Sequence, residues 1–214
     1  MIAYDVIETG PLAENCYLVW REGKAWLIDP GADFGRIEEM VRARGVEPVC
    51  VVLTHGHFDH LGALDEVLRR WPGLPVVLRE EDQRWAFTHP MNQYPPFYAH
   101  QRRPETLVAP GGRWACGGIE ACLIHTPGHT PGGQCVLLGQ GVPAPLCFTG
   151  DTLFQGSVGR TDLPGGSFPD LDASLKRLVG ALAPETTLLP GHGPATTMAR
   201  ERRDNPYLQE DPGF

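Results

Sequence analysis

The 214-residue chain has an ordinary globular composition, with 42% hydrophobic residues and a formal net charge of −8. No apolar run is long enough to span a bilayer, and the first ten residues lack the basic and apolar regions of a secretory signal. The acidic sequence, with a pI near 5.4, carries no basic footprint of a nucleic-acid binder. Six cysteines without a CxxC pair favour reduced thiols, so we expect a cytoplasmic protein.

The first third of the chain predicts five strands and two helices. Short apolar runs ended by turns indicate strands at 2–7, 15–20, 25–28, 49–53 and 76–78. The spacing of apolar residues predicts a helix over 34–44 and a second helix through 61–71. The run at 49–53 is nearly all apolar, which is typical of a strand covered on both faces.

Residues 80–112 form a loose, proline-containing stretch with aromatic residues and a short helix expected at 80–87. Long irregular segments in compact domains are often lids or binding loops, and a surface connection or an oligomer contact is the alternative. His89 and His100, in this stretch, are expected to be surface or pocket-lining residues.

The second half predicts a further group of strands and two helices. Strands are expected at 119–124, 134–138, 146–148 and 187–189. Apolar residues from Leu171 to Leu182 recur at helical spacing, and a short helix is expected at 196–204. Strands that come in runs with helices interspersed predict an α/β (α+β) protein in which two sheets pack together with helices outside.

Polar side chains collect in glycine- or proline-containing loops that follow four of the predicted strands. These residues are His55, His57, Asp59, His60, His129, Asp151 and His192. Any one of them alone is commonly a core or capping residue, and Asp59 could cap the helix that follows it. Rigid strands that present such loops at one edge can hold metal ligands in a fixed arrangement.

Nitrogen and oxygen donors without cysteine suit Zn²⁺, Fe²⁺ or Mn²⁺ rather than a closed thiolate site. Seven ligands exceed the needs of one tetrahedral ion, but they divide well between two ions about 3.5–4 Å apart. The sequence therefore predicts two divalent cations, with Zn²⁺ expected first.

The stretch HGHFDH at 55–60 matches the H-x-H-x-D-H signature of the metallo-β-lactamase fold superfamily. TPGHT, TGD and PGHG match its later ligand motifs in the same order. The resemblance implies an αββα sandwich of two mixed sheets flanked by helices, as a single domain over 1–214. It also implies one ion on His55, His57 and His129, a second ion on Asp59, His60 and His192, and Asp151 as the bridge between them.

Within the superfamily, the sequence is similar to short bacterial glyoxalase II-like hydrolases, through ENCYLV, LIDPG, HTPGHTPGG, TGDTLFQGSVGRTDLPGGS and LLPGHGPATT. This resemblance implies hydrolysis of S-acyl thioesters, with S-lactoylglutathione as the type substrate, by a hydroxide that bridges the two ions. Asp59 is expected to orient the nucleophile and take up a proton. Only a short helix and a tail follow His192, so the helical domain that holds glutathione in longer glyoxalase II enzymes is not expected.

Five residues near the motifs have other expected roles. Arg160 is the candidate for binding an anionic part of the substrate, since Arg pairs bidentately with carboxylates, and an ion pair with Asp162 or with the loop of Asp151 is the alternative. Asp29 is expected to orient a ligand loop, and His125 to lie at a strand end without being a ligand. Phe154, like Tyr17, is expected to pack in the core more readily than to line a pocket.

Other functions remain open alternatives. A persulfide dioxygenase would use one Fe²⁺ on His55, His129 and Asp151. A lactonase, a β-lactamase and a non-catalytic metal-binding protein are further possibilities. The expected partner is a small-molecule thioester, with no nucleic acid and no membrane, and the protein is expected to be a monomer or a homodimer.

Overall fold

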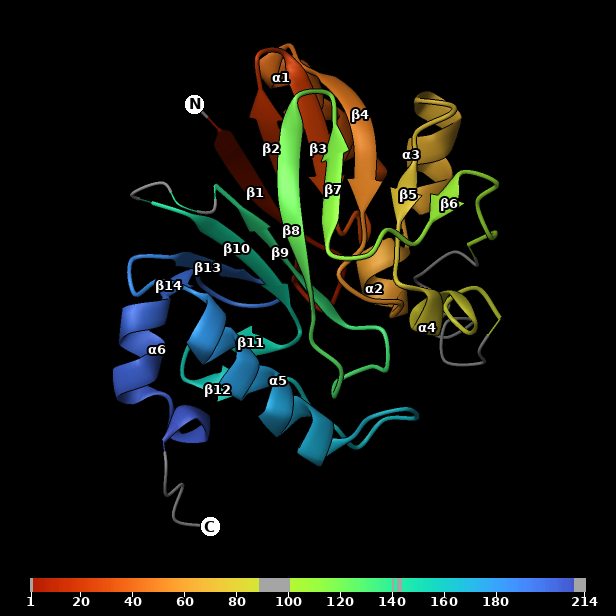
Figure 1. Ribbon diagram of the computed structural model, residues 1–214. Helices are drawn as coiled ribbons and strands as arrows, with labels where there is room; N and C mark the ends of the chain where they lie inside the picture. Colours follow the sequence, from red (N-terminus) through yellow and green to blue (C-terminus); the bar gives the residue numbers. More distant parts are fainter. Residues whose placement is uncertain (1, 89–100, 140, 142–143, 210–214) are drawn as a thin grey trace.

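Two six-stranded mixed sheets pack face to face in the computed structural model of the chain, and helices cover both outer faces (Figure 1). The structure describes residues 2–88, 101–139, 141 and 144–209, so His89 and His100 lie outside the described residues. The prediction of an αββα sandwich is confirmed. In the described part of the chain, no helix combines the length and the apolar character needed to cross a membrane.

The first sheet has the strand order β1-β2-β3-β4-β5-β6, antiparallel from β1 to β3 and parallel from β3 to β6. Its strands are β1 (Ala3–Thr9), β2 (Glu14–Arg21), β3 (Lys24–Ile28), β4 (Glu47–Val52), β5 (Val76–Val77) and β6 (Leu107–Val108). Helix α1 (Phe34–Arg44) connects β3 to β4, and α2 (Phe58–Leu61) and α3 (Leu64–Arg70) connect β4 to β5. Helix α4 (Glu80–Gln83) follows β5.

The second sheet has the order β14-β13-β10-β9-β8-β7, with β10 parallel to β13 and the other neighbours antiparallel. Its strands are β7 (Arg113–Cys116), β8 (Ile119–His125), β9 (Gln134–Leu138), β10 (Leu146–Gly150), β13 (Thr187–Pro190) and β14 (Thr196–Thr197). A small hairpin of β11 (Leu153–Phe154) and β12 (Ser157–Val158) follows β10. Helices α5 (Phe168–Ala181) and α6 (Met198–Asp204) and the 3-10 helix η2 (Pro206–Leu208) complete the chain.

Three apolar layers hold the sandwich together. Strand β2 shows the pattern, because Leu18 packs toward the helices of the first sheet while Tyr17 and Val19 pack toward the second sheet. On the other side of the sandwich, Leu171 of α5 packs against Cys147 of β10. Alternate side chains of a strand point to opposite faces, so a strand covered on both sides must be apolar along its length.

The structure corrects two of the predicted helices. The helix predicted through 61–71 is two helices, α2 and α3, because the Ala63 backbone N–H donates to Pro30 O at 3.0 Å instead of continuing the α2 hydrogen-bond ladder. The helix predicted at 80–87 ends at Gln83 and continues as turns. Strands β6, β7, β11, β12 and β14 were not predicted, since two to four residues give too little alternation to recognise.

Candidate metal centre

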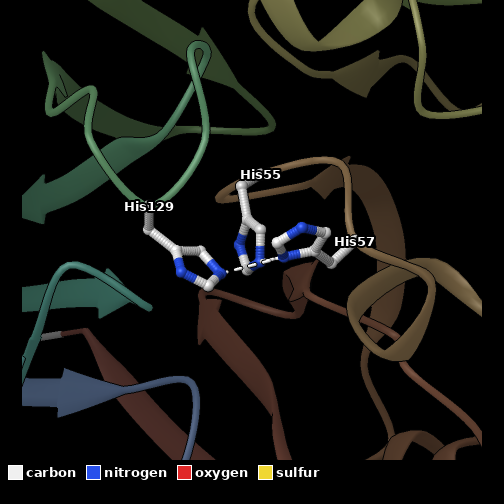
Figure 2. Close-up of side chains that lie close together, drawn as sticks. All are labelled: His55, His57 and His129. Atoms are coloured by element: carbon white, nitrogen blue, oxygen red, sulfur yellow. Dashed lines mark hydrogen bonds between the residues drawn. The ribbon is translucent and has the colours of Figure 1, made fainter. Parts of the chain in front are cut away.

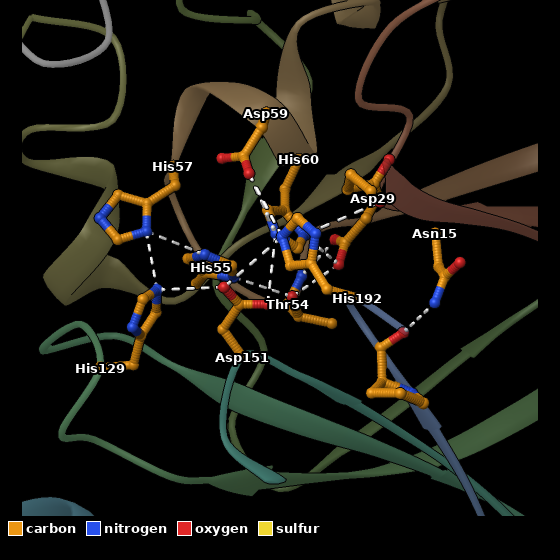
Figure 3. Close-up of polar contacts among 12 residues, drawn as sticks. Asn15, Asp29, Thr54, His55, His57, Asp59, His60, His129, Asp151 and His192 are labelled. Atoms are coloured by element: carbon orange, nitrogen blue, oxygen red, sulfur yellow. Dashed lines mark hydrogen bonds and ion pairs between the residues drawn. The ribbon is translucent and has the colours of Figure 1, made fainter. Parts of the chain in front are cut away.

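The loops that follow several strands converge at one edge of the sandwich. Parallel strands β3 and β4 end side by side in the first sheet. In the second sheet β8, β10 and β13 run in the same direction, so their carboxyl ends meet at the same edge. These loops bring together all seven predicted ligand residues, as Figure 3 shows: His55, His57, Asp59, His60, His129, Asp151 and His192.

Three imidazoles form the first cluster (Figure 2). His57 Nδ1 lies 3.0 Å from His55 Nε2 and 2.9 Å from His129 Nε2. Two nitrogens bound to one tetrahedral zinc ion are about 3.4 Å apart, so the observed spacing is close to that of ligands sharing one ion. All three side chains are buried. The first cluster therefore has the composition and spacing of a three-histidine metal site.

Asp59, His60 and His192 form the second cluster. Asp59 Oδ2 lies 3.3 Å from His192 Nε2 and 3.9 Å from His60 Nε2. Asp59 and His60 are buried, whereas the His192 side chain keeps 27% of its surface exposed. Solvent therefore reaches the second cluster more readily than the first.

Asp151 lies between the two clusters, and its two carboxylate oxygens point toward different histidines (Figure 3). Its Oδ1 lies 3.4 Å from His60 Nε2 of the second cluster. Its Oδ2 lies 3.4 Å from His129 Nε2 of the first cluster and 3.8 Å from His192 Nε2 of the second. This is the placement that a carboxylate shared by two cations requires.

Two buried polar atoms indicate that the residues fit a cation. Within the described residues, His60 Nε2 and Asp151 Oδ1 have no hydrogen-bond partner, although both are buried. An unsatisfied buried polar atom costs about 1–3 kcal/mol, so such atoms usually have a functional explanation. A cation bound by both atoms would remove this cost. The nitrogen and oxygen donors suit Zn²⁺, Fe²⁺ or Mn²⁺.

Backbone carbonyls fix the ring orientation of two candidate ligands. His129 Nδ1 lies 2.7 Å from Arg160 O, and His192 Nδ1 lies 3.1 Å from Leu12 O. Because a carbonyl oxygen only accepts, each Nδ1 carries the proton. The Nε2 lone pair of each ring is then free to bind a metal.

A buried hydrogen-bond chain fixes two further ligands. Asp29 Oδ2 accepts from His60 Nδ1 at 2.9 Å and from the Thr54 hydroxyl at 2.6 Å. The Thr54 hydroxyl, having donated its proton to Asp29, accepts from His55 Nδ1 at 3.0 Å. Asp29 therefore orients one ligand of each cluster, which agrees with the orienting role predicted for it.

The imidazoles of the two clusters differ in charge. Burial, reinforced by neighbouring imidazoles, lowers the pKa of His55 well below its usual value and the pKa of His57 to about 3. Burial also acts on His60, but Asp151 and Asp59 outweigh it and raise the pKa of His60 well above its usual value. His55 and His57 are therefore held neutral, and His60 retains a proton that a bound cation would replace.

The two carboxylates are held ionised. Burial alone would raise the pKa of Asp151, but His60 outweighs it and the pKa lies well below its usual value. The pKa of Asp59 is also lowered, because His60 and a hydrogen bond from His192 outweigh its burial. Ionised carboxylates and neutral imidazoles are the states in which these groups bind metal ions.

Asn15 holds the loop that carries His192, a role that sequence reasoning missed. Its Nδ2 donates to Pro190 O at 3.0 Å and to Gly193 O at 2.8 Å. Tyr17 is buried in the core, as predicted, and its hydroxyl also donates to Pro190 O at 2.7 Å. Polar residues at alternate positions of an otherwise apolar strand share one face, and this signal could have identified the pair.

Three other predictions have mixed outcomes. The Arg160 guanidinium is exposed and pairs bidentately with Asp162 at 2.7 Å for both contacts, which is the alternative named for it. His125 Nε2 donates to Pro131 O at 3.0 Å, and the residue belongs to neither cluster, as predicted. Phe154 is only partly buried, and its ring lies 6.3 Å from that of His192, so the core position predicted for it is wrong.

Solved structures of the same architecture match almost the whole chain. The B3 metallo-beta-lactamase BLEG-1 matches with a TM-score of 0.86 and 30% identity, over 97% of this chain and 100% of that one. TTHA1623, solved in a di-iron-bound form, matches with a TM-score of 0.82 and 37% identity, over 95% and 100% of the two chains. ETHE1 from Myxococcus xanthus matches with a TM-score of 0.75 and 28% identity, over 95% and 83%.

Curated relatives match over a similar length. The probable metallo-hydrolase YqgX of Bacillus subtilis is 33% identical over 202 residues, which cover 93% of this chain and 94% of the relative. Hydroxyacylglutathione hydrolase GloC of Haemophilus influenzae is 30% identical over 213 residues, covering 95% and 97%. The family described as the metallo-beta-lactamase superfamily matches residues 9–192. The resemblance seen in the motifs is confirmed, and the chain belongs to the metallo-β-lactamase superfamily.

Proposed function

We propose that the protein is a metal-dependent hydrolase that cleaves S-acyl thioesters in the manner of glyoxalase II. The observation that carries this proposal is the position of Asp151, whose two oxygens face the two clusters at 3.4 Å. The candidate ligands would then divide as the sequence predicts: His55, His57 and His129 for one ion, Asp59, His60 and His192 for the other, and Asp151 for both. Two ions that share a carboxylate are typical of hydrolytic sites.

When bound, two divalent ions would lower the pKa of water from about 15.7 toward about 7 and polarise the substrate carbonyl. The protein contributes the base. Asp59 is ionised because His60 and His192 outweigh the effect of burial on its pKa. Its carboxylate can therefore orient a water molecule and accept the proton that the water loses on attack.

A thioester suits this site because of its leaving group. In the described structure, the candidate ligands themselves make up the two clusters, and the neighbouring carboxyl groups of Asp29 and Glu14 lie by His60 Nδ1, at 2.9 and 3.8 Å, and not by the Nε2 that faces Asp151. A thiol has a pKa of about 8.5, so a thiolate leaves without protonation, whereas an amine or alkoxide needs an acid. The similarity to GloC over 95% of this chain supports the same substrate class.

Aromatic side chains border both clusters and offer an apolar surface to an acyl group or a thiol carrier. The ring of Trp85 lies 5.5 Å from that of His57, and the ring of Phe154 lies 6.3 Å from that of His192. Arg160, on the loop that holds His129, remains the candidate for binding an anionic group, which would have to displace Asp162.

The alternative on the same fold is a persulfide dioxygenase, since His129 Nε2 lies 3.4 Å from Asp151 Oδ2 and the two could share one ion with His55. Such an enzyme would use a single iron on His55, His129 and Asp151. The second cluster would then have no role in binding a metal, although its donor atoms lie within 4.8 Å of one another. The complete second cluster therefore favours the hydrolase with two ions.

The test pairs metal analysis with a substrate panel on one preparation. Zinc- and iron-loaded samples are assayed for thiol release from S-lactoylglutathione and other acyl thioesters, for oxygen uptake with glutathione persulfide, and for β-lactam opening. We expect thiol release without oxygen uptake, two ions per chain, and loss of activity on chelation. Oxygen uptake by the iron form without thioester cleavage would assign the alternative, and β-lactam opening alone would reject both.

A further inference from the structure

Asp82 is a buried carboxylate that no part of the proposed chemistry uses. It lies in α4, and its side chain is fully buried. Its Oδ2 accepts from the Gly56 backbone N–H at 2.8 Å and from the Thr130 hydroxyl at 2.8 Å, and its Oδ1 accepts from the Gly132 N–H at 2.6 Å. Three donors from neighbouring loops converge on its two oxygens and, with the Trp85 side chain, favour the ionised form, although burial raises the pKa of Asp82 above its usual value.

The three donors come from the two loops that carry the first cluster. Gly56 lies between His55 and His57, and Thr130 directly follows His129. Asp82 therefore joins the loop of the first sheet to the loop of the second sheet at the point where their imidazoles meet. Charge-assisted hydrogen bonds of this kind are about twice as strong as neutral ones.

Glycines permit this close approach. A Cβ on Gly132 would lie 2.6 Å from the Asp82 backbone nitrogen and from its Oδ1, which no real side chain tolerates. A Cβ on Gly56 would lie 2.8 Å from Ala86 Cβ in the turn that follows α4. The two loops are therefore shaped to receive the α4 segment and its carboxylate.

The second cluster is held by different groups. His60 is oriented by Asp29, and His192 by Leu12 O. The groups that donate to Asp82 include neither of these anchors. Asp82 therefore acts on the first cluster through the backbone N–H groups of Gly56 and Gly132 and the hydroxyl of Thr130.

We propose that Asp82 is a positioning residue that sets the spacing of His55, His57 and His129, and thereby the metal affinity of the first cluster alone. Ligands must be held within a few tenths of an ångström for tight binding, and loss of an outer hydrogen bond typically costs about 10–100-fold in metal affinity. The inference depends on metal binding and not on the thioester chemistry, so the failure of one leaves the other standing.

Asp82→Asn is the direct test, because it keeps the size of the side chain and turns an NH₂ group toward at least one of the three donors. Zinc affinity is measured by competition with a chromogenic chelator, without substrate. We expect one of the two binding steps to weaken by about 10–100-fold and the other to stay within about threefold of the wild type.

Glu201→Gln is the matched control. Glu201 is also a buried carboxylate with three donors, namely the Gly156 N–H, the Thr196 hydroxyl and the Asn205 amide, but none belongs to a ligand loop. The Glu201→Gln variant should have a lower melting temperature than the wild type in the metal-free state, as Asp82→Asn should. Both of its zinc affinities should stay unchanged. Equal effects of the two variants on zinc binding would reduce Asp82 to a stabilising residue.

A double-mutant comparison identifies the affected cluster. In a His192→Ala background, which weakens the second cluster, Asp82→Asn should still lower the remaining zinc affinity by about 10–100-fold. In a His129→Ala background, which weakens the first cluster, it should have little further effect. The reverse pattern, or equal losses in both backgrounds, would overturn the proposal. If Asp82→Asn does not fold, Thr130→Val removes one of the three hydrogen bonds and should shift the same step by a smaller factor.

Discussion

Replacing Asp29 by Asn is expected to weaken both metal clusters at once, unlike the change at Asp82. Asp29 Oδ2 accepts from His60 Nδ1 and from the Thr54 hydroxyl, while Oδ1 accepts from the Thr54 backbone N–H at 2.7 Å. Through Thr54 the same carboxylate orients His55. One substitution therefore disturbs a ligand from each cluster.

The magnitude follows from the donors that lose an acceptor. If the asparagine oxygen takes the place of Oδ1, its NH₂ group faces two donors, those of His60 and Thr54, in a site that is 2% exposed. An unsatisfied buried donor costs about 1–3 kcal/mol, so we expect the metal-free protein to lose about 2–6 kcal/mol of unfolding free energy. Each zinc affinity should fall by about 10–100-fold.

Urea unfolding in the presence of a chelator measures the first quantity, and zinc competition measures the second. Asp33→Asn is the control, because Asp33 is a partly exposed carboxylate that accepts one hydrogen bond, from the Gly10 N–H, and should change stability by no more than about 0.5 kcal/mol. If Asp29→Asn also stays within that limit and binds both ions normally, the hydrogen-bond chain from His60 to His55 does not orient the ligands.

Three further predictions concern single residues. Asp151→Ala should abolish hydrolysis and lower the content of both ions in metal analysis, and full activity would refute its bridging position. Arg160→Ala should keep zinc bound, because the carbonyl that holds His129 remains, and should raise KM for a thioester with an anionic carrier by more than about fivefold, which is the most that loss of an exposed ion pair accounts for; an unchanged KM would limit the guanidinium to its ion pair with Asp162. The pKa of His57 is about 3 in the folded protein and 6.5 in the unfolded chain. Between pH 3 and pH 6.5, His57 is therefore protonated in the unfolded chain but not in the folded protein. The metal-free protein should therefore lose up to about 1.4 kcal/mol per pH unit from this residue as the pH falls from 6.5 to 3, and His57→Gln, compared in urea titrations, should decline less steeply.

The candidate ligands could be predicted because each follows an apolar run directly. His55, His129 and His192 stand in short loops whose strands have clear patterns, and parallel strands end at a common edge. Local sequence thus determines both where the loops begin and which way they point.

The role of Asp82 could not be predicted, because its partners are distant in the sequence. In the sequence it belongs to the stretch REED, which reads as an exposed acidic turn of helix. Its partners lie 26, 48 and 50 residues away, so only the docking of the two sheets reveals them. The position of Phe154 was predicted wrongly for a related reason. A two-residue strand is too short for its sequence pattern to indicate whether an apolar residue faces the core or the site.

The anchors of the candidate ligands cross from one sheet to the other, which ties the metal site to the packing of the sandwich. Asn15 of the first sheet holds the loop of His192, and Gln134 of the second sheet donates to Leu53 O at 2.8 Å, just before His55. A change in the fit between the sheets must therefore change the ligand spacing, even where the altered residue touches no ligand. By linkage, ions that bind only the docked sheets stabilise that docking by RT ln(1 + [L]/Kd), about 2.7 kcal/mol at a hundredfold excess over Kd. The same cross-sheet hydrogen bonds hence serve both the stability of the fold and the affinity of the site.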